Sequence, residues 1–188
     1  MQGKEIKLLG ICGSLRKESY NKHLLDLLQQ HLKAEHVDLK CINLLDYELP
    51  LYNHDIASTG NIPQAVHTLR QLLDDSHGLL LVTPEYCGSV PGALKNAIDW
   101  LSIPLDREDA VYAAFKDKPW GIAIATTSKV GGLKCVEHLK GIAGSVGSVT
   151  MPRALVIHET QELTAIKLQH VSRFTQTLAK FVRRWYGE

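Results

Sequence analysis

The strongest limit on the fold comes from a pattern that recurs along the chain: a short apolar run, then a polar loop, then a helical pattern. The runs at 6–12, 79–82 and 120–125 are mostly apolar, which is typical of parallel strands buried on both faces. After each loop, apolar residues recur every three or four positions, as on one face of a helix. This alternation predicts an α/β protein with a parallel sheet and helices on both faces.

Five alternations of strand and helix are expected. The sequence itself contains no internal repeat, low-complexity tract or linker. Strands are predicted at 4–12, 37–44, 79–82, 120–125 and 149–157, the last one bent at Pro152. Helices are predicted from the first loop to about residue 35 and at 63–75, 91–101, 133–143 and 161–186. Between them lie an irregular segment, 46–61, and an interruption at 103–118 with a short helical pattern at 108–115.

Three polar loops follow strands one, three and four, at 13–21, 83–91 and 126–132. With a strand order of 2-1-3-4-5 these loops are neighbours at the carboxyl edge of the sheet, where open α/β sheets bind ligands. We call them loop 1, loop 2 and loop 3.

Loop 1 joins the end of a strand to the start of a helix, where free backbone N–H groups and the helix dipole favour an anion. Ser14 and Ser19 offer hydroxyl donors, and Arg16 offers a charged fork suited to phosphate. Asn21 offers an amide, and Gly13 allows the backbone to approach a ligand closely. The pattern fits a phosphate site, but it also fits an ordinary turn in which Ser19 or Asn21 caps the helix.

The composition narrows the classes of partner. The chain has 188 residues, 45% of them hydrophobic, and is long enough for a sizeable core. Its net charge is only +1, so it lacks the excess of basic residues that would indicate binding to a nucleic acid or an anionic membrane. The amino-terminal apolar run is too short to span a membrane, so a cytoplasmic location is expected. The four cysteines, Cys12, Cys41, Cys87 and Cys135, lack zinc-like spacing and are expected to be free thiols.

The most specific pattern runs from Thr83 to Ser102. It resembles the second motif of the NADPH-dependent FMN reductase family, the flavodoxin-like quinone, chromate and azo-dye reductases. That motif, Pro-Glu-Tyr-Asn-x-Ser-x-Pro-Gly-x-Leu-Lys-Asn-Ala-Ile-Asp-Trp, is matched at every specified position except Cys87, which replaces asparagine. The family's phosphate loop, Gly-Ser-x-Arg-x-x-Ser-x-Asn, is matched from Gly13 to Asn21. The resemblance covers nearly the whole chain.

The resemblance implies a single flavodoxin-like FMN-binding domain over 1–188, a three-layer sandwich with a five-stranded parallel sheet of order 2-1-3-4-5. It implies bound FMN, NADPH or NADH as the hydride donor, and a quinone, chromate, azo compound or free flavin as the acceptor. Flavin N5 then carries the chemistry, and we expect neither a catalytic side chain nor a metal. The resemblance also implies a homodimer or homotetramer. Two alternatives are open for Ala93, Ala97 and Trp100: they lie in the subunit interface, or they pack on the sheet.

The same resemblance assigns the site residues. The FMN phosphate is expected to contact Ser14, Arg16, Ser19, Tyr20 and Asn21. The isoalloxazine ring is expected to lie against Pro84, Glu85, Tyr86, Cys87, Gly88 and Ser128. Arg107 and Lys129 are candidates for the phosphates of the nicotinamide nucleotide. Cys87 is either a tolerated substitution or a redox-sensitive thiol, and segment 103–118 either covers the flavin or forms a subunit contact.

Two other functions would use the same site. An FMN-binding electron carrier, or a flavin sensor, would bind FMN without a substrate of its own. Carriers of the flavodoxin type tend to be acidic, whereas the net charge here is +1. The Pro84-Glu85-Tyr86 motif favours the reductase, because it is the reductases that it resembles.

Overall fold

The structure, a computed structural model, describes residues 5–106, 108–158 and 164–187. Its centre is a parallel sheet made of β1 (Ile6–Cys12), β2 (Val37–Asn43), β3 (Gly78–Val82), β4 (Pro119–Ala125), β5 (Val149–Thr150) and β6 (Leu155–Ile157). The order is β2-β1-β3-β4, and β5 and β6 both pair with β4. The predicted order 2-1-3-4-5 is therefore confirmed. The fifth position holds two short strands instead of one, with the break close to the bend predicted at Pro152.

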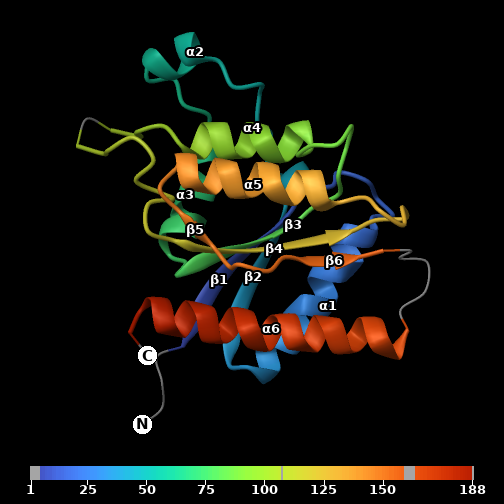
Figure 1. Ribbon diagram of the computed structural model, residues 1–188. Helices are drawn as coiled ribbons and strands as arrows, with labels where there is room; N and C mark the ends of the chain where they lie inside the picture. The colour runs from blue at the N-terminus through green and yellow to red at the C-terminus, as the bar shows by residue number, and fades with distance from the viewer. Residues whose placement is uncertain (1–4, 107, 159–163, 188) are drawn as a thin grey trace.

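Helices cover both faces of this sheet (Figure 1). α1 (Tyr20–Ala34) and α6 (Ala165–Trp185) lie on one face, and α3 (Gln64–Asp74), α4 (Gly92–Leu101) and α5 (Leu133–Ser145) lie on the other. The buried apolar side chains form two clusters, one for each face. β3 is buried at every position, because it lies at the centre between both helical layers. None of the described helices is long and apolar enough to cross a membrane.

The helices begin close to where the sequence predicts. The Ser19 hydroxyl accepts hydrogen bonds from the N–H groups of Asn21 and Lys22, which have no partner within α1. α3 and α4 begin one residue after Pro63 and Pro91, whose fixed φ suits a helix start. The predicted start of the last helix, at 161–163, lies outside the described residues.

The segment after α4 differs from the prediction. No helix forms among the described residues of 108–115, because the chain turns repeatedly there and Tyr112 has a φ of +66°. The segment lies at the amino edge of the sheet: Lys118 directly precedes β4, and its Nζ donates to the carbonyl of Ser76, just before β3. The candidate flavin loops are at the opposite edge, so the suggestion that this segment covers the flavin is wrong.

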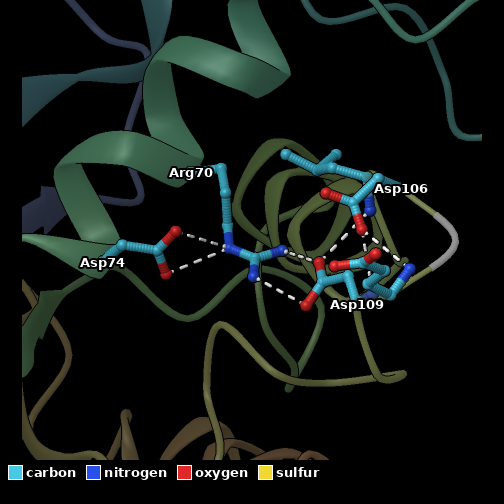
Figure 2. A pocket seen from close by; sticks show the side chains of 6 residues that line it. Arg70, Asp74, Asp106 and Asp109 are labelled. Carbon is cyan, nitrogen blue, oxygen red and sulfur yellow. Dashed lines mark hydrogen bonds and ion pairs between the residues drawn. The ribbon is translucent and has the colours of Figure 1, made fainter.

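Arg70 fastens this segment to α3 (Figure 2). Its Nε donates to Asp74 on the same helix, and its Nη1 donates to Asp109 at 2.7 Å. Beside the guanidinium lies an open hollow of about 350 Å³ lined mainly by acidic side chains. Because it too is at the amino edge, it is separate from the candidate site.

A second excursion follows β2 and contains a 3-10 turn at Leu44–Asp46 and α2 (His54–Ser58), which projects above α4 (Figure 1). α2 falls within a segment predicted to be irregular. Trp100 Nε1 donates to the carbonyl of Pro50 at 2.8 Å, and Asn96 Oδ1 accepts from the N–H of Tyr52 at 2.7 Å. Trp100 is fully buried within the chain, as is Ala97. Ala97 therefore packs in the core beside the sheet, whereas Trp100 packs against this excursion, and the predicted interface contact of the half-buried Ala93 stays a prediction.

Candidate functional site

Loops 1, 2 and 3 meet at the carboxyl edge of the sheet. They follow β1, β3 and β4, which are adjacent strands, so polar residues far apart in sequence come together there. Two contacts join them directly: the N–H of Gly13 donates to the carbonyl of Val82 at 2.9 Å, and the Asn21 side chain pairs with the backbone of Ala125. In Figure 1 this edge is on the right, where the β4 arrow points.

Loop 1 presents backbone donors at the start of a long helix. The N–H groups of Leu15, Lys17 and Glu18 have no acceptor among the described residues. Ser14 is buried and its Oγ accepts from the N–H of Arg16 at 3.3 Å, while the Arg16 side chain is exposed. Unpaired amides, a helix N-terminus and a guanidinium together suit a phosphate dianion, so the residues present fit FMN at this end.

The Asn21 side chain links loop 1 to β4, a contact that the sequence did not reveal. Its Nδ2 donates to the carbonyl of Ala125 at 2.9 Å, and its Oδ1 accepts from the N–H of Ala125 at 2.8 Å. The amide therefore ties the first turn of α1 to the end of β4. Its predicted contact with the phosphate stays a prediction.

Gly13 is required for packing between loop 1 and loop 2. A Cβ at this position would lie 2.3 Å from Thr83 Oγ1 and 3.0 Å from a methyl carbon of Leu94. Any side chain at this position would therefore push loop 1 away from the end of β3. The predicted close approach of a ligand to the backbone at this glycine stays a prediction.

Loop 2 contains a tight turn from Tyr86 to Ser89. These two residues exchange N–H···O bonds of 3.0 and 2.9 Å, and the two residues between them have positive φ, +50° at Cys87 and +72° at Gly88. Positive φ at both central positions defines a type I′ turn, in which asparagine is favoured first and glycine second. This accounts for the asparagine of the family motif, and it places Cys87 and the 44% exposed Tyr86 at the tip.

Side chains of loop 2 contact α5, and these contacts were not predicted. Glu85 Oε2 accepts from the N–H of Cys135 at 2.9 Å, and Ser89 Oγ lies 2.9 Å from His138 Nδ1. The Lys134 side chain passes over the turn, because a Cβ at Gly88 would meet its Cδ at 3.3 Å. Nothing in the sequence marked Lys134 or His138, since their importance depends on how α5 is placed.

Loop 3 is organised by its own hydroxyl groups. Ser128 Oγ accepts from the N–H groups of Val130 and Gly131, at 3.2 and 3.1 Å. His158, which follows β6, lies with its Nδ1 3.0 Å from the carbonyl of Ser128. It was missed because no motif includes it. The predicted flavin contact of Ser128 stays a prediction, and Arg107 lies outside the described residues.

Two buried thiols lie beneath these loops. Burial raises the pKa of Cys12, whose Sγ donates to the carbonyl of Ser14. Burial, and then the charge of Glu85, raise the pKa of Cys135 to about 12. Both thiols are therefore protonated at neutral pH and unsuited to act as nucleophiles.

An open parallel sheet of order 2-1-3-4-5 with helices on both faces defines a flavodoxin-like protein. Residues 6–162 match the family described as NADPH-dependent FMN reductase. The chain belongs to this family, and it is an enzyme of the NAD(P)H-dependent FMN reductase or quinone reductase type.

Similar proteins support the assignment. The chain is 30% identical over 186 residues to a 2-hydroxy-1,4-benzoquinone reductase of a Burkholderia species, covering 96% of each chain. It is 32% identical over 148 residues to a quinone reductase of Escherichia coli, covering 79% of this chain and 74% of that protein. Among solved structures, it is similar to FerB, a flavoenzyme NAD(P)H:(acceptor) oxidoreductase of Paracoccus denitrificans, with a TM-score of 0.76 and 26% identity over 95% of this chain and 98% of that one.

Proposed function

We propose that residues 1–188 form one FMN-binding domain that passes electrons from NADPH or NADH to a small acceptor of the quinone class. The observation that carries this proposal is the set of unpaired N–H groups in loop 1 beside the exposed Arg16. A relative that covers nearly the whole chain is named for a benzoquinone substrate. Chromate, azo compounds and free flavin are the acceptors to compare with quinones.

The phosphate of FMN is assigned to loop 1. Ser14, Arg16, Ser19, Tyr20 and Asn21 surround it in this assignment, with the backbone N–H groups supplying most of the donors. Ser19 and Asn21 also fix the shape of the loop through their own hydrogen bonds. The cradle is therefore formed before the ligand arrives, which lowers the entropy cost of binding.

The ring of FMN is assigned to the stretch 84–88 of loop 2, together with Ser128 of loop 3. The tip residues Tyr86 and Cys87 are exposed, and the N–H groups of Cys87 and Gly88 have no acceptor among the described residues. Such donors suit the pyrimidine edge of a flavin, where negative charge gathers on reduction. When bound, FMN supplies N5, the atom that accepts the hydride. The protein positions the reactants.

The decisive experiment is anaerobic reduction. The protein is loaded with FMN, oxygen is removed, NADPH is added, and the absorption band of the oxidised flavin is followed. Rapid bleaching that a quinone reverses is the expected result. Bound flavin that stays oxidised with both NADPH and NADH would contradict the proposal and indicate a carrier or a sensor.

Arg16 supplies a sharper test of the phosphate assignment. Arg16→Ala is expected to weaken FMN binding by about 1.5–3 kcal/mol, a factor of about 10 to 150 in Kd, because a charged hydrogen-bond donor is lost. Lys33→Ala removes an exposed cation in the last turn of α1, far from loop 1, and serves as the matched control, with an unchanged Kd expected. Equal Kd values for wild type and Arg16→Ala, measured by fluorescence titration, would refute the assignment.

A homodimer or homotetramer is also proposed. Apolar side chains are exposed on and near the excursion above α4, where Leu51 is 84% and Leu45 is 55% exposed, and such residues favour association. Light scattering should give a mass well above the 20.9 kDa of one chain. A cytoplasmic location is proposed as well, because four free cysteines are typical of a reducing compartment.

A further inference from the structure

The carboxylate of Glu85 accepts a hydrogen bond from the first turn of α5. Cys135 is the third residue of α5 and donates its N–H to Glu85 Oε2 at 2.9 Å. N–H groups in the first turn of a helix have no acceptor within the helix. The residue at the capping position, Gly132, has a φ of +100° and offers no side chain. Loop 2 therefore provides the side-chain acceptor that the start of α5 lacks.

The contacts between loop 2 and α5 lie on both sides of the exposed turn. Before the turn, Cys135 Sγ lies 3.7 Å from the carbonyl of Pro84, next to the Glu85 contact. After the turn, Ser89 Oγ lies 2.9 Å from His138 Nδ1. Since α5 begins where loop 3 ends, these contacts also fix loop 2 relative to loop 3. The two loops assigned to the ring are thus held together through one helix.

We propose that Glu85 is a positioning residue, which caps α5 and thereby holds the Tyr86–Ser89 turn against loop 3 at the distance that the flavin ring requires. The inference rests on the proposed function of this site and changes the role of one residue in it: the Glu85 side chain acts through α5 and not on the flavin. A carboxylate suits this position, because the amino end of a helix favours negative charge.

The Cys135 thiol reports directly on this contact. Cys135 is fully buried beneath Pro84 and Glu85, so a thiol reagent reaches it only when loop 2 separates from α5. Cys87 is exposed and must first be replaced by Cys87→Ser. In that background, the labelling rate of Cys135, identified by peptide mass, measures opening of the contact without any need for cofactor or activity.

Two variants separate positioning from direct contact. Glu85→Ala is expected to raise the labelling rate of Cys135 and the Kd for FMN by about tenfold each, because the acceptor for the Cys135 N–H is lost. Glu85→Gln keeps an acceptor oxygen, so both quantities should stay within about threefold of wild type. Glu137→Ala removes an exposed carboxylate of α5 that pairs with Lys140 and should change neither. Labelling of buried Cys12 should stay slow throughout, which distinguishes local opening from unfolding.

Several outcomes would overturn the proposal. If Glu85→Ala leaves Cys135 protected and FMN binding unchanged, Glu85 does not position the loop. If Glu85→Gln loses as much FMN affinity as Glu85→Ala while Cys135 stays protected, the carboxylate acts on the flavin directly. Should Glu85→Ala fail to fold, Glu85→Asp, with a carboxylate one carbon shorter, is tested for the same two increases. A wild-type protein that binds no FMN would refute the proposed function, whereas labelling of the cofactor-free variants would still decide whether Glu85 caps α5.

Discussion

At the scale of single residues, the replacement of asparagine by Cys87 is the clearest departure from the family motif. Cys87 occupies the first central position of a type I′ turn, with a φ of +50°. Left-handed backbone costs ordinary L-residues about 1–2 kcal/mol, whereas asparagine tolerates it better because its short polar side chain bonds locally. The substitution therefore affects the turn itself, in addition to any effect on flavin.

This strain predicts opposite effects for two substitutions. Cys87→Asn should raise the free energy of unfolding by about 0.5–1 kcal/mol, because it relieves left-handed strain. Cys87→Val should lower it by about 1–2 kcal/mol, since a β-branched residue tolerates positive φ poorly. Urea unfolding of the cofactor-free proteins measures both changes. A Cys87→Val protein as stable as Cys87→Asn would show that the turn is not strained.

At the scale of elements, the site depends on contacts between a helix and a distant strand. Asn21 lies in the first turn of α1, and both of its hydrogen bonds reach Ala125, the last residue of β4. The side chain is buried, so neither backbone group of Ala125 would find water as a substitute. This single amide fixes loop 1 relative to the start of loop 3.

Removal of the amide should therefore be costly. Asn21→Ala is expected to lower the free energy of unfolding by about 2–4 kcal/mol, because a donor and an acceptor lose their partners in a buried site. Ser19→Ala, which removes the N-cap of α1, should cost about 1 kcal/mol. Thermal and urea unfolding compare the two variants. Equal losses would mean that Asn21 contributes no more than an ordinary cap.

Across the whole molecule, the two edges of the sheet differ in function: one carries the candidate site, and the other carries a stabilising contact. The candidate site lies at the carboxyl edge. At the amino edge, the ion pair between Arg70 and Asp109 holds the segment of Asp109 against α3 (Figure 2). The side chains of Arg70 and Asp109 are only 12% and 14% exposed. Hydrogen bonds from Arg70 hold the pKa of the Asp109 carboxyl below its ordinary value of 3.8.

The lowered pKa of Asp109 sets the pH range in which its ion pair with Arg70 stabilises the fold. The folded state favours the charged carboxylate, so the stabilisation is complete above about pH 3.8 and is lost as the pH falls through the lower folded-state pKa. Asp109→Asn should lower the free energy of unfolding at pH 7 by about 1–3 kcal/mol. This difference should shrink towards zero in increasingly acidic solution. A difference that persists when the carboxyl is fully protonated would rule out the charge of Asp109 as its source.

The α/β class, the loops at the carboxyl edge and, through two motifs, the family could be predicted from the order of residues alone. These properties follow from local spacing: apolar runs define buried strands, and the motifs are continuous in the chain. Helix starts at Pro63 and Pro91 were predictable for the same reason. The predicted helix at 108–115 failed because a residue at positive φ, Tyr112, interrupts it, and side-chain pattern alone does not reveal backbone angles.

The contacts of several motif residues could not be predicted, because their partners are distant in sequence. Glu85 finds its partner 50 residues away at Cys135, and Asn96 finds the carbonyl of Pro50 46 residues away. Gly13 is needed because of Thr83, which directly follows β3, the neighbouring strand in the sheet. Such partners become neighbours only after parallel strands have aligned and helices have packed on them. The motifs therefore identified most of the residues discussed for the site, whereas the packed sheet and helices specified what each one contacts and added His138 and His158, which no motif includes.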